Sequence, residues 1–255
     1  MRAAAADYRN QSLKNVNFNL TKYPFSFGMM MPQQRKGVFL MNNNLTEIVF
    51  ILDRSGSMAG LEDDTIGGFN AMVEKQKKEQ GEAVLSAVLF SDGSQVLYDR
   101  VDIQKIEPMT DRQYQVGGCT ALLDAIGGAV HHITNVHKYA REEDRPGKTI
   151  FVITTDGMEN ASRAYTYDEV QRMVKHEQEK YGWEFLFLGA NMDAISAARS
   201  FGIRADRAVR YRRDSAGTAL NYSVVSETVA RVRRRESIEP DWSAPIEADV
   251  KKRGE

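Results

Sequence analysis

The sequence has few features that would place the protein outside a reducing compartment or inside a membrane. Its single cysteine, Cys119, cannot form a disulfide within the chain, which fits a reducing compartment and leads us to expect a cytoplasmic protein. No apolar run approaches the roughly 20 residues that a membrane-spanning helix needs, so no membrane partner is expected. The N-terminal stretch MRAAAADYRN becomes polar before an apolar segment of about 7 to 15 residues can form, which argues against a secretory signal.

Motifs of several enzyme classes are also missing. The chain has no G-x-x-x-x-G-K-[ST] loop for phosphates, no G-x-G-x-x-G after its first predicted strand and no G-x-S-x-G nucleophile elbow. On one predicted helix, His131, His132 and His137 lack the i, i+4 spacing of a zinc-binding pair. We interpret these histidines as surface or helix-end residues.

What is present is the composition of a globular protein. With 255 residues, 42% of them apolar and 27% charged, the chain can bury the core of one large domain. The net charge of −1 names no partner by itself. Arginines gather between Arg204 and Arg235, and we interpret them as solvated faces and as charges that suit a helix C-terminus. Contact with a nucleic acid or an acidic protein is the alternative interpretation.

Residues 1–43 are predicted to be an N-terminal extension. The segment before Met41 shows no sustained period of 2 or 3.6 and is rich in Asn, Gln and Lys, so we expect it to be disordered or loosely docked. Two alternatives stay open. The segment is either an upstream leader with Met41 as the true first residue, or an arm that binds a partner through Tyr23, Phe25 and Phe27.

Strand-like and helix-like segments then alternate through residues 44–235, the predicted domain, before a polar C-terminal tail at 236–255. The strand-like segments read IVFIL, AVLSAVLF, QVLYDRVDI, KTIFVITT, WEFLFLGAN and RAVRYRR. Apolar residues at helical spacing occur at about 66–81, 122–141, 166–181, 193–202 and 220–232. This order predicts an α/β fold: a Rossmann-like, doubly wound, mostly parallel six-stranded sheet with one antiparallel edge strand and helices on both faces.

Local signals mark the ends of several elements. Asp92-Gly93 lies between two strand-like runs and predicts a tight hairpin, so one strand of that pair must be antiparallel. Thr166 and Glu169 have the spacing of a capping box at a helix N-terminus. Gly81 is placed to end the first helix.

Oxygen-bearing side chains follow two of the predicted strands. Asp53, Ser55 and Ser57 come directly after VFIL, and Asp156 follows FVITT. Ligands of open α/β sheets bind where such strand ends meet, so we expect the two carboxylates to lie close together. Thr120, in GGCTALLDAI, adds another hydroxyl. Carboxylates, hydroxyls and water suit octahedral Mg²⁺ or Mn²⁺, whereas zinc favours Cys and His.

Three segments together resemble the metal-ion-dependent adhesion site (MIDAS) of von Willebrand factor type A (vWA) domains: DRSGS, GGCTAL and TTDGMEN. The resemblance covers about residues 44–235, and DRSGSMAG and GCTALLDAIGGAV are most similar to free-standing bacterial or phage versions, which are intracellular. One departure is Cys119, which lies between Gly118 and Thr120. We interpret Cys119 as a packed residue because a soft thiolate suits a hard cation badly.

The resemblance implies roles for individual residues. It matches Ser55, Ser57 and Thr120 to the direct metal ligands, and Asp53 and Asp156 to carboxylates that act through water or hold the hydroxyls in place. A cation with mostly neutral ligands keeps much of its charge and can accept an external carboxylate, so the expected partner is a protein that presents Glu or Asp. The predicted rim of the site comprises Arg54, Met58, Glu159, Asn160 and Asn191.

The resulting hypothesis is a non-enzymatic, metal-ion-dependent protein-binding module. Some proteins of the family that it resembles work beside AAA+ ATPases or in stress-response systems, so an AAA+ ATPase is one partner that the resemblance suggests. The alternative is an Mg²⁺-dependent phosphoryl hydrolase with Asp53 as nucleophile, similar to phosphatases of the haloacid dehalogenase type. Those enzymes place a second Asp two residues later, where this chain has Ser55.

Overall fold

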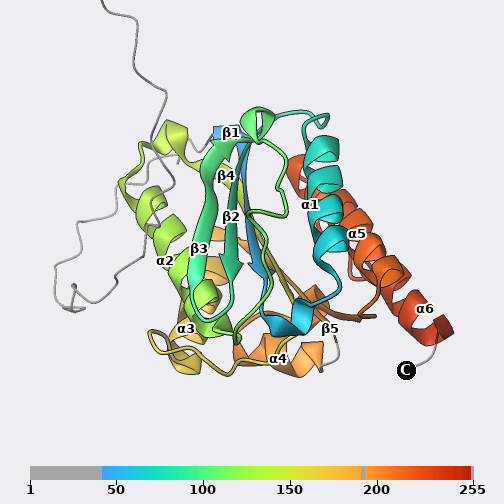
Figure 1. The fold of residues 1–255 in the computed structure, drawn as a ribbon. Helices are drawn as coiled ribbons and strands as arrows, with labels where there is room; N and C mark the ends of the chain where they lie inside the picture. Colours follow the sequence, from blue (N-terminus) through green and yellow to red (C-terminus); the bar gives the residue numbers. More distant parts are fainter. Residues whose placement is uncertain (1–41, 191–192, 254–255) are drawn as a thin grey trace, which may run out of the picture.

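One sheet of six strands lies at the centre of the part of the chain that the structure describes. The structure is a computed structural model that describes residues 42–190 and 193–253 (Figure 1). The sheet has the order β3-β2-β1-β4-β5-β6. Its strands are β1 (Asn42–Asp53), β2 (Glu82–Phe90), β3 (Ser94–Asp102), β4 (Pro146–Thr155), β5 (Glu184–Ala190) and β6 (Ala208–Tyr211).

The strand pairing confirms the predicted mostly parallel sheet with one antiparallel edge strand. β1 pairs in parallel with both β2 and β4, and β4, β5 and β6 continue in parallel. β3 is antiparallel to β2 and lies at the edge. The chain runs outward from β1 to β3, returns to β4 beside β1, and then runs outward to β6. The strand order therefore reverses between β1 and β4, which is where sheets of this kind bind ligands.

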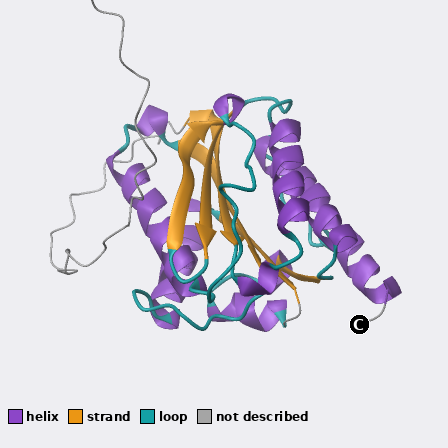
Figure 2. Ribbon diagram, viewed as in Figure 1, coloured by secondary structure: helices purple, strands orange, loops and turns teal. Residues whose placement is uncertain are grey.

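Helices cover both faces of the sheet (Figures 1 and 2). On one face lie α1 (Glu62–Gln76), α5 (Ser215–Arg233) and α6 (Ala244–Arg253), and on the other lie α2 (Leu122–Tyr139), α3 (Tyr167–Tyr181) and α4 (Ala194–Ser200). Short 3-10 turns occur at η1 (Gly56–Met58), η2 (Ile103–Lys105), η3 (Glu142–Asp144) and η4 (Ala205–Arg207). Among the described helices, none has both the length and the apolar character that crossing a bilayer requires.

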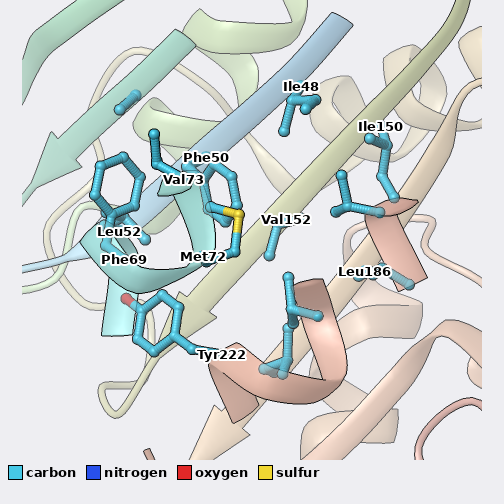
Figure 3. Close-up of a cluster of buried hydrophobic side chains, with 14 of the residues drawn as sticks. Ile48, Phe50, Leu52, Phe69, Met72, Val73, Ile150, Val152, Leu186 and Tyr222 are labelled. Carbon is cyan, nitrogen blue, oxygen red and sulfur yellow. The ribbon is translucent and has the colours of Figure 1, made fainter. Parts of the chain in front are cut away.

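The core has two layers because successive side chains of each strand point to opposite faces. Phe50 of β1 faces α1, where it meets the Phe69 ring edge-on at 5.4 Å between centroids (Figure 3). Its neighbour Ile51 faces the layer of α2, α3 and α4. Each layer also holds a tryptophan, Trp242 in the first and Trp183 in the second. Burial on both faces explains why the strands read as continuous apolar runs.

Two local predictions are confirmed by the hydrogen bonds. Ser91 to Gly93 connect β2 to the antiparallel β3, as the Asp-Gly pair predicts. The Thr166 hydroxyl accepts a hydrogen bond from the Glu169 backbone N–H at 3.4 Å, and the Glu169 carboxylate accepts one from the Thr166 N–H at 2.8 Å. This capping box opens α3.

The first helix ends earlier than predicted. α1 stops at Gln76 rather than at Gly81. The reason is tertiary, because the Arg233 guanidinium of α5 donates hydrogen bonds to the backbone carbonyls of Gln76 and, at 2.8 Å, of Gly81. Carbonyl groups at a helix end need partners from outside the helix, and here a buried arginine supplies them.

The predicted polar tail at 236–255 is in part an element of the fold. Ile238, Trp242 and Ile246 are buried in the same layer as α1 and α5, and α6 packs against β6 and α5. The Trp242 indole N–H donates a hydrogen bond to the Asp206 carbonyl at 2.9 Å. Isolated apolar residues in a polar stretch gave no clear period, which is why the sequence indicated a tail.

The structure begins at β1, whose first residue, Asn42, precedes the predicted domain boundary at 44 by two positions. The predictions for the N-terminal extension, including the arm with Tyr23, Phe25 and Phe27, fall outside the described residues.

A buried ionic cluster lies in the amino-terminal half of β1. The Glu47 carboxylate is fully buried and contacts Arg100 Nε at 2.7 Å and His137 Nε2 at 2.6 Å. The His137 ring also meets the Trp183 ring edge-on at 5.2 Å between centroids. His137 therefore lies in the last turn of α2, as a helix-end residue, and its side chain is largely packed against the fold.

Candidate metal centre

Asp53 anchors the turn that follows β1, and its side chain is almost fully buried. Its Oδ1 accepts a hydrogen bond from the Ser55 backbone N–H at 2.6 Å, and its Oδ2 accepts one from the Thr155 hydroxyl at 2.7 Å. The Thr155 hydroxyl in turn accepts a hydrogen bond from the Gly157 N–H at 3.1 Å. One carboxylate therefore ties the end of β1 to the end of β4.

Hydroxyl groups from two loops converge beside Gly157. The Oγ atoms of Ser55 and Ser57 lie 2.9 Å apart. A Cβ atom at Gly157 would clash with Thr120 Oγ1 and would lie 3.2 Å from Ser57 Oγ. The Ser57 and Thr120 hydroxyls thus face the same glycine, and the missing side chain leaves room between them.

Backbone hydrogen bonds hold the two loops together. The Gly56 N–H donates to the Gly118 carbonyl at 3.0 Å, and the Gly117 N–H donates to the Arg54 carbonyl at 2.9 Å. Gly118 has a left-handed φ of 81°, and its place against the Asp92 carboxylate leaves no room for a Cβ. The exposed Cys119 donates its backbone N–H to Asp92 Oδ1 at 2.9 Å. Cys119 is therefore an exposed loop residue and not the packed one that the sequence suggested, while the next residue, Thr120, is buried.

Two of the predicted rim residues hold the site together from the side. Asn160 Oδ1 accepts a hydrogen bond from the Thr120 N–H at 2.9 Å, and the Asn160 N–H donates to the Thr120 carbonyl at 3.1 Å. Glu159 Oε2 accepts from the Leu123 N–H at 2.8 Å in the first turn of α2, where a negative charge is favourable. Glu159 and Asn160 thus fix the loop that presents the Thr120 hydroxyl.

The other rim predictions have mixed outcomes. Met58 is buried, with 3% of its surface exposed, so its side chain does not line an open rim. Arg54 is half-buried. Asn191 lies outside the described residues. An exposed apolar side chain does lie beside the site at Met158, which the sequence did not single out.

An arginine that the sequence assigned to the solvated surface also reaches this site. Arg213 follows β6, and its Nε forms an ion pair with the buried Asp156 carboxylate. Its Nη2 donates hydrogen bonds to the Ser57 and Ala59 carbonyls, both at 2.6 Å, and Nε donates to the Ser57 carbonyl at 2.9 Å. Arg213 thus joins Asp156 to the turn that carries Ser57.

Buried tyrosines lie beneath the polar site. Burial, followed by the negative charge of Asp156, raises the pKa of Tyr211 well above its usual range. Burial also raises the pKa of Tyr114, whose hydroxyl donates a hydrogen bond to the Asp53 carbonyl. Both phenols are therefore neutral at physiological pH and add no negative charge to the site.

The donor chemistry fits a hard divalent cation. The converging groups are hydroxyls with two neighbouring carboxylates, and oxygen donors of this kind suit Mg²⁺ or Mn²⁺. Within residues 42–190 and 193–253, no group of three or more His, Cys, Asp or Glu side chains could hold a metal ion. A zinc site built from Cys and His is therefore not what the described chain offers.

Solved structures share this fold at low sequence identity. A von Willebrand factor type A protein from Catenulispora acidiphila matches 74% of this chain and 43% of its own, with a TM-score of 0.50 and 16% identity. Proximal thread matrix protein 1 from the mussel byssus, in a structure with a zinc-occupied MIDAS motif, matches 75% of this chain and 47% of its own, with a TM-score of 0.50 and 14% identity. The pilus adhesin SpaC from Lactobacillus rhamnosus GG matches 75% of this chain and 31% of its own, with a TM-score of 0.57 and 11% identity.

In each case the match spans less than half of the solved chain. Neither the family models nor the curated proteins gave a match to this sequence. The sheet order, the helices on both faces and the likeness to these structures show that the described chain has the fold of von Willebrand factor type A domains.

Proposed function

We propose that this chain is a non-enzymatic protein-binding module that uses a divalent metal, Mg²⁺ or Mn²⁺, to take a Glu or Asp side chain of a partner protein. The observation that carries the proposal is that the Ser57 and Thr120 hydroxyls meet beside Gly157, with the Ser55 hydroxyl 2.9 Å from that of Ser57. This convergence lies at the carboxyl ends of β1 and β4, where the strand order reverses.

In this proposal the chain's own residues hold the site in shape before any ligand arrives. Asp53 fixes the turn by accepting hydrogen bonds from the Ser55 N–H and the Thr155 hydroxyl. Asn160 fixes the Thr120 backbone from both sides. Ser55, Ser57 and Thr120 would then hold the metal, with Asp53 and Asp156 beside them. When bound, the metal would supply a positive charge that attracts a carboxylate.

The choice of metal follows from the donors. The mussel protein has zinc in its MIDAS motif, so a MIDAS motif can hold a divalent cation other than magnesium. Here the proposed ligands are hydroxyl oxygens, which suit the harder Mg²⁺ and Mn²⁺ better than zinc. We therefore propose that Mg²⁺ or Mn²⁺ is the working ion.

The hydrolase alternative is less well supported by the contacts of Asp53. Both of its carboxylate oxygens accept hydrogen bonds within the fold, and the side chain is only 1% exposed. A nucleophilic carboxylate must reach its substrate, and the residue two positions later is Ser55 rather than an acid. Assay of a generic phosphate ester with Mg²⁺ tests this alternative, because turnover that is lost in Asp53→Asn would favour the hydrolase.

Calorimetric titration of metal tests the site directly. We expect Mg²⁺ to bind the wild type, and Thr120→Ala to bind it at least about tenfold more weakly, a loss of about 1.4 kcal/mol. Thr110→Ala, at an exposed threonine in another loop, is the matched control. Equal affinity of wild type and Thr120→Ala would refute the ligand assignment.

The chemistry of the site identifies the proposed partner as a protein that presents Glu or Asp. We propose AAA+ ATPases as the class to test first, on the resemblance of the sequence alone, and a cytoplasmic setting in which to test them. Binding of a candidate ATPase should require Mg²⁺, should be abolished by EDTA, and should be lost in the Ser55→Ala/Ser57→Ala double variant. Binding that survives both treatments would mean that the partner uses another surface.

A further inference from the structure

Arg213 brings a fixed positive charge to the proposed metal site. Its partner Asp156 has a side chain that is 3% exposed, and the Arg213 side chain is 32% exposed. Ion pairs that are shielded from water interact more strongly than exposed pairs. Gly157 follows Asp156 directly and lies against the Ser57 and Thr120 hydroxyls, so Asp156 adjoins the proposed metal ligands while it pairs with Arg213.

The same guanidinium also contacts the backbone of the turn that carries the proposed ligand Ser57. It donates hydrogen bonds to the carbonyls of Ser57 and Ala59, which flank Met58 in the turn after β1. Arginine is suited to such bridging because its planar group carries several donors in a fixed arrangement. Arg213 therefore affects metal binding in two opposite ways. It holds the turn in place, and its charge repels any second cation that approaches Asp156.

We propose that Arg213 is a tethered cation that stabilises the metal-free site and lowers its affinity for divalent metal. The inference rests on the proposed function, because it assumes that a cation binds beside Asp156. Arg213 acts through Asp156 and the 57–59 turn, so it is a positioning residue. Its charge competes with the metal for Asp156, so the metal must weaken an ion pair that the fold already contains.

Removal of the charge separates the two effects. Arg213→Gln keeps a hydrogen-bond donor for the backbone carbonyls but carries no charge. We expect this variant to bind Mg²⁺ about tenfold more tightly than the wild type in calorimetric titration, and to unfold at a lower temperature when no metal is present. If Arg213 had only a structural role, Arg213→Gln would lower both the metal affinity and the stability. A variant that binds Mg²⁺ more tightly but is less stable therefore indicates competition between Arg213 and the metal.

Two variants serve as controls. Arg213→Lys keeps the charge and should leave the Mg²⁺ affinity within about threefold of the wild type. Arg204→Gln removes one positive charge at the other end of β6, where Arg204 pairs with Asp206. It should leave the metal affinity unchanged and thereby exclude an effect of net charge.

The outcomes distinguish this inference from the proposed function. If the wild type binds Mg²⁺ through Thr120 but Arg213→Gln binds it equally or more weakly, the inference is wrong and the proposed function stands. If the wild type shows no binding and Arg213→Gln does bind, the inference is supported, since the internal cation then blocks the site. If neither binds Mg²⁺ or Mn²⁺ at millimolar concentration, both proposals fail.

Discussion

The Thr155 hydroxyl donates a 2.7 Å hydrogen bond to Asp53 Oδ2, and through it the last residue of β4 holds the last residue of β1. Both residues are buried, so water cannot replace this bond. The pair lies where the strand order reverses. The conformation of the turn that carries Ser55 and Ser57 therefore depends on a contact between two neighbouring strands.

Thr155→Val should destabilise the fold by about 1 to 3 kcal/mol, because valine keeps the volume but leaves a buried carboxylate oxygen without its donor. Urea unfolding at pH 7 measures the change. Thr154→Val, at the adjacent and less buried position, is the control and should cost clearly less. Equal costs for the two variants would show that the hydroxyl of Thr155 is not what stabilises the turn.

Gly157→Ala should weaken Mg²⁺ binding at least about tenfold, since its Cβ would clash with Thr120 Oγ1 and displace a proposed ligand. The measurement is again calorimetric titration. Gly128→Ala provides the contrast, because a Cβ at Gly128 in α2 would meet nothing within 4 Å. That variant should keep the metal affinity and gain up to about 1 kcal/mol of stability from the better helix former. Unchanged affinity in Gly157→Ala would place the metal elsewhere.

The pair formed by His132 and Asp99 should make stability depend on pH. Their side chains lie 2.8 Å apart and are 28% and 51% exposed. The hydrogen bond to Asp99 raises the pKa of His132 above 6.5, and the same bond lowers the pKa of Asp99 below 3.8. Glu47 further raises the pKa of His132, whereas Arg100 lowers it.

Both shifts arise first from the same bond, so the pair stabilises the fold fully between pH 3.8 and pH 6.5, and it loses this effect as pH rises through the folded-state pKa of His132. Asp99→Asn should therefore cost about 0.5 kcal/mol near pH 5.5, as expected for a partly exposed pair, and almost nothing near pH 8.5. Asp111→Asn, at an exposed carboxylate, should show no such difference. A cost for Asp99→Asn that is the same at both pH values would argue against the pair.

Trp242→Ala should cost about 3 kcal/mol, because it removes a large side chain from the layer formed by α1, α5 and α6. Denaturant unfolding measures the loss. Tyr139→Ala, whose side chain is 78% exposed at the end of α2, should stay within about 0.5 kcal/mol of the wild type. A small effect for Trp242→Ala would mean that 236–253 contributes little to the stability of the fold.

The sheet and its helices could be predicted because their signals are local and repeated. A strand such as β1 reads as an apolar run since both of its faces are buried, and the capping box of α3 is visible as Thr166 and Glu169. The positions of Asp53 and Asp156 at strand ends follow from the same pattern. This is why the residues of the site that directly follow strands could be inferred from the order of strands and helices in the sequence.

Other features depend on contacts between distant segments. Arg213 meets Asp156 across 57 positions of sequence, and the pairing of β6 with β5 in the sheet places its loop near the site. In the sequence it is one of many arginines in a polar stretch. Two other arginines also connect distant segments inside the fold. Arg233 donates a hydrogen bond to the Gly81 carbonyl beyond the end of α1, and Arg207 pairs with Glu184 at 3.1 Å. A charged side chain does not reveal in sequence whether it faces water or the fold.

The two tryptophans of the chain lie in different layers, Trp183 beside α2 and α3 and Trp242 beside α5 and α6. Their fluorescence therefore reports on the two sides of the sheet separately. In Trp183→Phe the remaining signal follows the layer closed by the C-terminal helix, and in Trp242→Phe it follows the opposite layer. Unfolding curves of the two variants, each followed by its single fluorophore, will reveal whether the layers melt together or in sequence.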